Sequence, residues 1–296
     1  MTTFKIPLDL KTRPRYRGSR LSKEGLHYNN AFLNQENRQE ILQWLSTIHP
    51  IWENRFSAHN PPPLGQEQRR LLRPVYWLGN WQFACLDYYH PPKGVLYRCV
   101  RAEPFPAVLK KLVEGIERTT KQMFRGLDIP RDWNLNTCLV NFYGTRIENG
   151  KRIDTARVGE HRDYEPGPVA SISLGERALF QFVSSQRPGQ RDGVVLQQWL
   201  DDGSLQIFGG EQWKDRLFHR VQRVESKGDH DFPINVADFE SRRINLTFRF
   251  VPEEHILPYS RLPQELADDT YEYMAELAKH SSFFAGELEA RKKSAR

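Results

Sequence analysis

The feature that most limits the fold is a series of short, strand-like segments in the second half of the chain. From Asn136 onward, runs of β-branched and aromatic residues alternate with turn signals, and Asp202-Gly203 is a typical hairpin turn between two of them. Strands this short and this numerous indicate a β-sandwich or a jelly-roll barrel. The expected strands are 137–143, 169–174, 178–183, 194–200, 204–208, 217–224 and 243–251.

Helical patterns flank this β region on both sides. Asn34 can cap a helix that carries apolar residues on one face and ends at Pro50. A second helix is expected to begin near residues 104–106, and residues 263–290 return to helix. We therefore expect an α+β protein with a mainly β core and flanking N- and C-terminal helices.

The composition is that of an ordinary globular chain. Of 296 residues, 39% are hydrophobic and 27% are charged, which excludes a disordered or collagen-like chain. No apolar run reaches the roughly 18 residues of a membrane helix, and residues 1–20 lack the apolar segment of a secretory signal. Three cysteines do not make a disulfide framework. We expect a monomer that is neither secreted nor membrane-bound, located in the cytoplasm, or in the nucleus of a eukaryote.

The net charge of +6 is concentrated near the N-terminus. Between Lys5 and Lys23 there are seven lysines and arginines and one acid, Asp9, and the rest of the chain is balanced. Such an arm can hold phosphates by counterion release, or it can be a solubilising tail. The expected segments are therefore a basic arm (1–33), a helical extension (34–135), the β core (136–252) and C-terminal helices with a basic tail (253–296).

The local motif that most clearly suggests a metal site is His161-Arg162-Asp163. Its two ligand-type side chains, at i and i+2, share one face of an extended segment. His219 lies in the expected strand 217–224, toward the far end of the sheet. Two histidines and one carboxylate are the ligand set of non-haem Fe(II) oxygenases. The alternative for His219 is a buried core histidine.

Two expected strands each carry a polar face. Arg243, Asn245 and Arg249 alternate with apolar residues on one strand, and Asn141 and Tyr143 do so on another. A solvated strand face would give the same alternation. Beside a metal triad, however, the two faces indicate a pocket for a dicarboxylate, because arginine binds carboxylates through two parallel hydrogen bonds.

Six motifs follow one another in an order that resembles a known family. They are Asn141-x-Tyr143, His161-x-Asp163, Ser171-Ile-Ser-Leu-Gly175, Gly209-Gly-Glu211, His219 and Arg243-x-Asn245-Leu-Thr-Phe-Arg249. Residues 136–252 thereby resemble the AlkB family of Fe(II)/2-oxoglutarate dioxygenases. The resemblance implies a double-stranded β-helix (a cupin-like jelly roll) with iron held by His161, Asp163 and His219. It further implies that Asn141, Tyr143 and Arg243 bind one carboxylate of 2-oxoglutarate, with Asn245 and Arg249 near the other.

The resemblance also implies an activity. In the family, Fe(II), O₂ and 2-oxoglutarate drive hydroxylation of N-methyl groups on nucleobases, with release of formaldehyde, succinate and CO₂. The implied function is demethylation of alkylated DNA or RNA. One alternative keeps the iron chemistry but acts on a protein side chain or a small molecule. The other is a catalytically silent nucleic-acid-binding relative.

The resemblance points to three substrate contacts. Glu165, two residues after Asp163, corresponds to the carboxylate that reads the exocyclic amine of the base, although a loop glutamate would look the same. Gly94-Val-Leu-Tyr97 is similar to the family's nucleotide-recognition lid, which implies roles for Tyr97 and Tyr88, with Val95 in place of a tyrosine. The other aromatic residues of 75–89 are more typical of a core.

A basic hairpin is expected beside the site. Asn149-Gly150 is a hairpin turn within a segment that carries Arg146, Lys151 and Arg152. These residues are candidates for gripping a phosphate backbone, and the alternative is a solvated turn.

Overall fold

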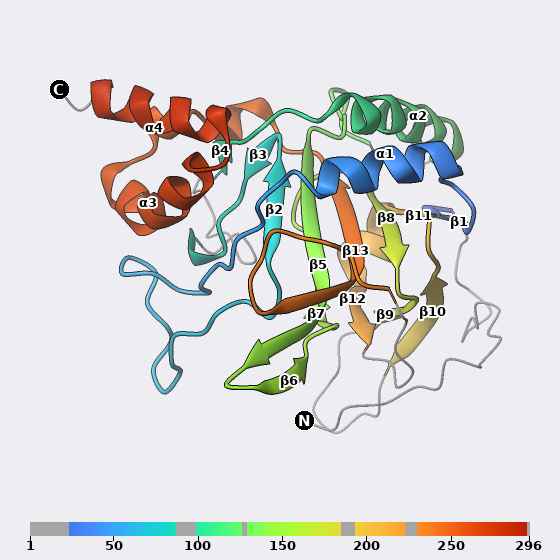
Figure 1. The fold of residues 1–296 in the computed structure, drawn as a ribbon. Coiled ribbons are helices and arrows are strands. Elements are labelled where there is room, and N and C mark those ends of the chain that lie inside the picture. The colour runs from blue at the N-terminus through green and yellow to red at the C-terminus, as the bar shows by residue number, and fades with distance from the viewer. Residues whose placement is uncertain (1–23, 87–98, 126–128, 185–192, 223–229, 295–296) are drawn as a thin grey trace.

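Two β-sheets pack face to face and form the centre of the fold (Figure 1). The computed structural model describes residues 24–86, 99–125, 129–184, 193–222 and 230–294. The larger sheet contains β1 (Leu26–Asn29), β2 (Val75–Leu78), β5 (Thr137–Glu148), β6 (Lys151–Asp154), β8 (Val169–Gly175), β11 (Ser204–Phe208) and β13 (Phe239–Arg249). Its order is β1-β11-β8-β13-β5-β2, with β6 paired to β5.

The smaller sheet closes the other side of the barrel. It contains β7 (Val158–His161), β9 (Ala178–Val183), β10 (Val194–Leu200) and β12 (Phe218–Gln222), in the order β10-β9-β12-β7. Phe180 of this sheet lies 6.0 Å from Phe208 of the larger sheet, measured between ring centroids. The two sheets therefore share an apolar core at one end of the barrel. A third, short sheet joins β3 (Asn80–Trp81), β4 (Cys99–Arg101) and β14 (Ile256–Leu257).

Both faces of β13 are buried, for two different reasons. Ile244, Leu246 and Phe248 are fully buried in the main hydrophobic core, against the helices. The residues that alternate with them, such as Arg243 and Asn245, line the inside of the barrel. A strand that is apolar on its helix side and polar on its barrel side holds a polar site without exposing it to bulk water.

Helices cover the outer face of the larger sheet. They are α1 (Gln35–Leu45), α2 (Ala107–Met123), α3 (Gln264–Ala278) and α4 (Ser282–Ser294), and all four contribute to the main core. In Figure 1, α1 and α2 cross the right half of this face, and α3 and α4 lie at its left. No helix among the described residues has the length and apolarity to cross a membrane.

The first helix begins as expected but ends earlier. Asn34 caps α1 by accepting a hydrogen bond from the backbone N–H of Asn37 at 2.7 Å. The helix ends at Leu45, five residues before Pro50, because the hydroxyls of Ser46 and Thr47 donate to the carbonyls of Gln43 and Trp44. These hydroxyls satisfy carbonyl groups that another helical turn would have used.

The predicted fold class is confirmed. A mainly β, jelly-roll core is flanked by N- and C-terminal helices, and the strands predicted at 178–183, 194–200 and 204–208 are present with those bounds. The larger sheet also takes β1 from the segment expected to be the basic arm and β2 from the extension. The predicted C-terminal helical segment is interrupted between α3 and α4, where residues 279–281 form a turn. Tyr76, Trp77, Trp81 and Phe83 are core residues.

Candidate active site

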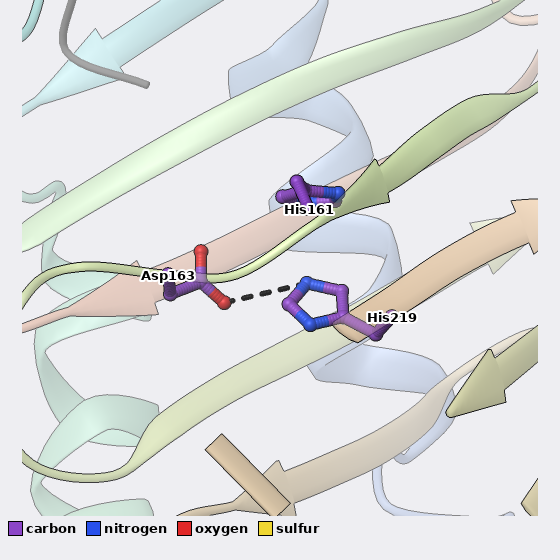
Figure 2. A group of neighbouring side chains, drawn as sticks. All are labelled: His161, Asp163 and His219. Carbon is purple, nitrogen blue, oxygen red and sulfur yellow. Dashed lines mark ion pairs between the residues drawn. The ribbon is translucent and has the colours of Figure 1, made fainter. Parts of the chain in front are cut away.

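Two histidines and one aspartate meet inside the barrel. His161 is the last residue of β7, and it lies directly opposite His219 of β12 in the sheet register. Asp163 follows β7 by two residues and turns back toward them (Figure 2). One ligand atom from each of the three side chains lies within 4.8 Å of the other two. Three residues predicted from the sequence as metal ligands are therefore brought together.

The two oxygens of Asp163 have different surroundings. Nε and Nη2 of Arg249 both lie close to Oδ1, at 2.8 Å and 2.7 Å. Oδ2 lies 3.5 Å from Nε2 of His219 (Figure 2) and has no hydrogen-bond partner in the described part of the chain. Arg249 thus fixes the carboxylate by one oxygen and leaves the other available to a metal ion.

A buried lysine also holds the aspartate. Nζ of Lys214, which is 6% exposed, donates to the backbone carbonyl of Asp163 at 3.1 Å. Lys214 belongs to a π-helical turn, Glu211–Arg216, that precedes β12. π-Helical turns are frequent at functional sites, and this one anchors the backbone that carries the carboxylate.

The protonation states suit a divalent cation. Burial, followed by the neighbouring His161, lowers the pKa of His219 to about 3, and burial also lowers the pKa of His161. For Asp163, burial alone would raise the pKa, but Arg249 and the two histidines outweigh it and hold that pKa below its usual range. At neutral pH the cluster is two neutral imidazoles and one carboxylate, the state that binds metal ions.

A hydrogen bond to the backbone fixes the ring orientation of His161. Its Nδ1 lies 2.9 Å from the carbonyl oxygen of Gly159, and a carbonyl only accepts hydrogen bonds. The proton is therefore assigned to Nδ1, and Nε2 keeps a lone pair for a metal. The donor set and the unbonded Oδ2 of Asp163 together fit Fe(II).

The cavity that contains the triad is also lined by arginine side chains. The cavity that holds the three ligands is also lined by the five residues expected to bind 2-oxoglutarate: Asn141, Tyr143, Arg243, Asn245 and Arg249. Arg243 is 4% exposed, lies over the ring of Tyr143 at 4.8 Å, and donates through Nη2 to the hydroxyl of Ser173 at 3.2 Å.

The unpaired donors of Arg243 show most clearly whether the pocket fits an anion such as 2-oxoglutarate. Its Nε and Nη1 are buried without a hydrogen-bond acceptor among the described residues. Burying a guanidinium is costly unless an anion accompanies it. A carboxylate of 2-oxoglutarate could accept from Nη1 at the end of the guanidinium or from Nε at its side, so the residues present fit this cosubstrate.

Arg73 is a pocket residue that the sequence did not reveal. Its Nε donates to Oδ1 of Asn141 at 2.6 Å, and its guanidinium lies 5.1 Å from the centre of the Tyr143 ring. This contact leaves the amide NH₂ of Asn141 as the donor available to the cavity. No sequence signal separates Arg73 from Arg69 and Arg70, because only the pairing of β2 with β5 brings it into the site.

Of the substrate residues inferred from the resemblance, Glu165 lies at the cavity. Glu165 lines the same cavity as the triad, and its Oε2 lies 3.6 Å from Nε of Arg249. Tyr164, which the sequence analysis did not select, is 49% exposed at the cavity wall. Tyr88 and Tyr97 lie outside the described residues.

The basic hairpin is present, but it does not line the cavity. Asn149 and Gly150 have φ values of 49° and 72°, as a tight turn between β5 and β6 requires. Arg146 pairs with Glu148 at 2.8 Å, and Arg152 pairs with Glu240. Lys151 is exposed. The role of these three residues in gripping a strand stays a prediction.

The site agrees with the proteins that this chain resembles. A family model described as the 2OG-Fe(II) oxygenase superfamily matches residues 25–249. The alpha-ketoglutarate-dependent dioxygenase AlkB of Escherichia coli (strain K12) is 30% identical over 119 residues, which are 40% of this chain and 46% of AlkB. The chain therefore matches somewhat less than half of that curated relative, and the predicted resemblance to the AlkB family is confirmed.

Three solved structures are among those that match this chain. The structure of OsALKBH1 has a TM-score of 0.49 and 21% identity, and the match covers 78% of this chain and all of that one. A 2OG-Fe(II) oxygenase-family oxidoreductase from Burkholderia pseudomallei has a TM-score of 0.40 and 11% identity, with 76% and 84% of the two chains covered. A prolyl-4-hydroxylase from Pseudomonas putida has a TM-score of 0.36 and 12% identity, with 77% and 94% covered.

Proposed function

Because the chain belongs to the 2OG-Fe(II) oxygenase superfamily, we propose that it is an oxidative demethylase of alkylated nucleobases in DNA or RNA. Membership makes it a dioxygenase that uses Fe(II), 2-oxoglutarate and O₂. The proposed reaction hydroxylates an N-alkyl group on a base and releases formaldehyde, succinate and CO₂. The finer assignment, the nucleic-acid substrate, is argued from the residues at the cavity.

Each residue of the cavity has a definable task. When bound, Fe(II) with 2-oxoglutarate and O₂ supplies the oxidation of an otherwise unreactive C–H bond. His161, His219 and Oδ2 of Asp163 would hold the metal, and Arg249 keeps Asp163 oriented. Arg243 would bind a carboxylate of 2-oxoglutarate through one of its unpaired donors. The protein contributes position and charge rather than acid–base catalysis.

The observation that carries the substrate assignment is the place of Glu165. Its carboxylate belongs to the wall of the same cavity as the metal ligands. A carboxylate accepts hydrogen bonds, so it can read the exocyclic amine of an adenine or cytosine. Tyr164 offers an exposed ring beside it, and bases that enter an active-site pocket stack on such rings.

The test is a panel of oligonucleotides that each contain one methylated base. Each is incubated with the full chain, Fe(II), 2-oxoglutarate and O₂, and then analysed by mass spectrometry. At least one oligonucleotide should lose 14 mass units with release of formaldehyde, a value set by the replacement of CH₃ by H. Succinate release that is stimulated by a protein or a small molecule, and by none of the oligonucleotides, would instead support the alternative substrate class.

A second comparison tests the base contact. Glu165→Gln keeps the size of the side chain but adds a donor where an amine needs an acceptor, so kcat/KM for the active oligonucleotide should fall about tenfold or more. Glu114→Gln, an exposed position on α2, is the matched control. An equal effect of the two substitutions would remove the support that Glu165 gives to the proposal.

A further inference from the structure

An arginine-rich cleft opens beside the candidate active site. It has a volume of about 430 Å³, and six arginines and one glutamate are among the residues that line it. The arginines are Arg55, Arg69, Arg70, Arg73, Arg157 and Arg162. This concentration of positive charge lies outside the N-terminal arm and was not apparent in the sequence, because residues 55–73 and 157–162 are far apart along the chain.

The cleft is continuous with the cavity that holds the triad. The residues common to both walls are Arg73, Val158, His161, Arg162 and Tyr164. His161 is a candidate metal ligand, so a molecule lying in the cleft reaches the edge of the metal site. The exposure of the arginines decreases in the same direction, from exposed Arg69 and Arg70 to buried Arg73.

Backbone pairing and aromatic rings hold the outer arginines in place. The N–H of Arg55 donates to the carbonyl of Arg69, and the N–H of Leu71 donates to that of Glu53, both at 2.8 Å. The guanidinium of Arg70 lies 5.7 Å from the Trp52 ring, and that of Arg69 lies 6.0 Å from the Phe56 ring. Cation–π contacts of this kind restrict a side chain without neutralising its charge.

Few carboxylates balance this charge. Glu160 is the one acid among the described residues that line the cleft, and it pairs at 2.6 Å with Arg220, which lies outside that lining. Arg69, Arg70, Arg157 and Arg162 form no ion pair with a carboxylate of the described residues. Arg162 donates to the backbone carbonyl of Asp215 at 2.7 Å and lies 4.6 Å from the Phe218 ring, and neither contact brings a negative charge to it. A polyanion is the partner that complements such a surface.

We propose that this cleft binds the phosphate backbone of a single nucleic-acid strand while the target base enters the adjacent cavity. The inference rests on the proposed function and adds the path of the strand to it. The acidic side chains of a peptide would also complement the arginines, but they carry no flat ring for Tyr164, which lies at the junction of cleft and cavity, whereas every nucleotide carries one. The arrangement therefore favours a strand whose phosphates lie outside and whose base lies inside.

Salt-dependent binding tests the cleft directly. The full chain, with Fe(II) and 2-oxoglutarate under anaerobic conditions, is titrated with an unmethylated single-stranded 15-mer at several KCl concentrations. The variant is Arg69→Ala with Arg70→Ala, and both side chains are exposed, so folding should be preserved. The matched control is Arg118→Ala with Arg125→Ala, two exposed arginines at and just after α2. In Figure 1, α2 lies at the upper right and the segment 55–73 lies at the lower left.

The two variants should behave differently. Each phosphate contact on a single strand contributes about 0.7 to the slope of log K against log salt, so the cleft variant should lose about 1.4 in slope and bind about 20-fold more weakly near 0.1 M salt. The control should retain the wild-type slope. An unchanged slope in the cleft variant, or an equal loss in the control, overturns the proposal. Displacement of the 15-mer by poly-glutamate at equal charge concentration would assign the cleft to an acidic peptide instead.

Kinetics separate a failure of this inference from a failure of the proposed function. The ratio of kcat/KM for a methylated oligonucleotide to that for the free methylated nucleoside should fall at least tenfold in the cleft variant. If the wild type demethylates oligonucleotides and this ratio does not change, the cleft inference alone is wrong. If strand binding depends on Arg69 and Arg70 and no methylated base is oxidised, the proposed function is wrong and the cleft inference stands.

Discussion

At the scale of single residues, the most informative detail is that the two carboxylate oxygens of Asp163 have different roles. One carboxylate oxygen is held by Arg249, and the other is turned toward His219. An aspartate with hydrogen bonds at both oxygens would have fewer lone pairs to offer a metal, and one held at neither oxygen would rotate. The combination of one fixed and one unbonded oxygen is what a ligand residue requires.

Arg243 gives the sharpest prediction at this scale. Arg243→Met removes the buried guanidinium but keeps much of its volume, so KM for 2-oxoglutarate should rise about 10- to 100-fold, the equivalent of one or two charged hydrogen bonds. Arg243→Lys keeps the charge but not the two parallel donors, and it should give an intermediate value. The measurement is succinate formation at varied 2-oxoglutarate concentration. If KM is the same in both variants as in the wild type, Arg243 does not bind the cosubstrate.

At the scale of elements, the sequence predicts strand positions that depend on neighbouring residues, but it does not predict which strands pair. Strands β9, β10 and β11 match their predicted bounds because alternation and turn residues are properties of neighbouring positions. Strand β13 begins at Phe239, four residues before the predicted start, since its pairing with β5 extends the strand beyond the alternating motif. The triad was predicted from its ligand types, with a core histidine as the alternative for His219, and then from motifs that resemble a known family.

The residues that were missed depend on long-range contacts. Arg73 enters the pocket only through the pairing of β2 with β5, and Lys214 reaches Asp163 only because a π-helical turn points it inward. Neither feature leaves a pattern in the sequence. The arginine cleft was missed for the same reason, because it joins two distant segments.

The π-helical turn Glu211–Arg216 leads to a test of positioning. Lys214→Met removes the hydrogen bond to the Asp163 carbonyl while the apolar stem stays packed, so Fe(II) affinity measured anaerobically should fall about tenfold. Lys111→Met, at an exposed site on α2, is the control. A change in thermal stability without a change in Fe(II) affinity would mean that Lys214 is structural only.

The β5–β6 hairpin gives the second prediction for an element. Changing Arg146, Lys151 and Arg152 together to Ala should reduce the salt slope of strand binding, but by less than the cleft variant, because two of the three cations already pair with carboxylates. The same anaerobic titration measures it. A larger loss in the hairpin variant than in the cleft variant would move the main backbone contact from the cleft to the hairpin.

At the scale of the whole molecule, the two sides of the larger sheet have separate roles. Its outer face is packed against the four helices and provides the main hydrophobic core. Its inner face, together with the smaller sheet, encloses the metal ligands and the guanidinium pocket, and the arginine cleft opens from there. The fold thus places an apolar, stabilising layer on one side of the sheet and a polar, reactive layer on the other.

The most direct test of the central claim is the stoichiometry of the products. With one Fe(II) per chain, excess 2-oxoglutarate and O₂, and an oligonucleotide carrying the methylated base, succinate and formaldehyde should appear in equal amounts, and both should be lost in Asp163→Ala. Succinate formed at the same rate with and without the oligonucleotide, and no formaldehyde, would contradict the account.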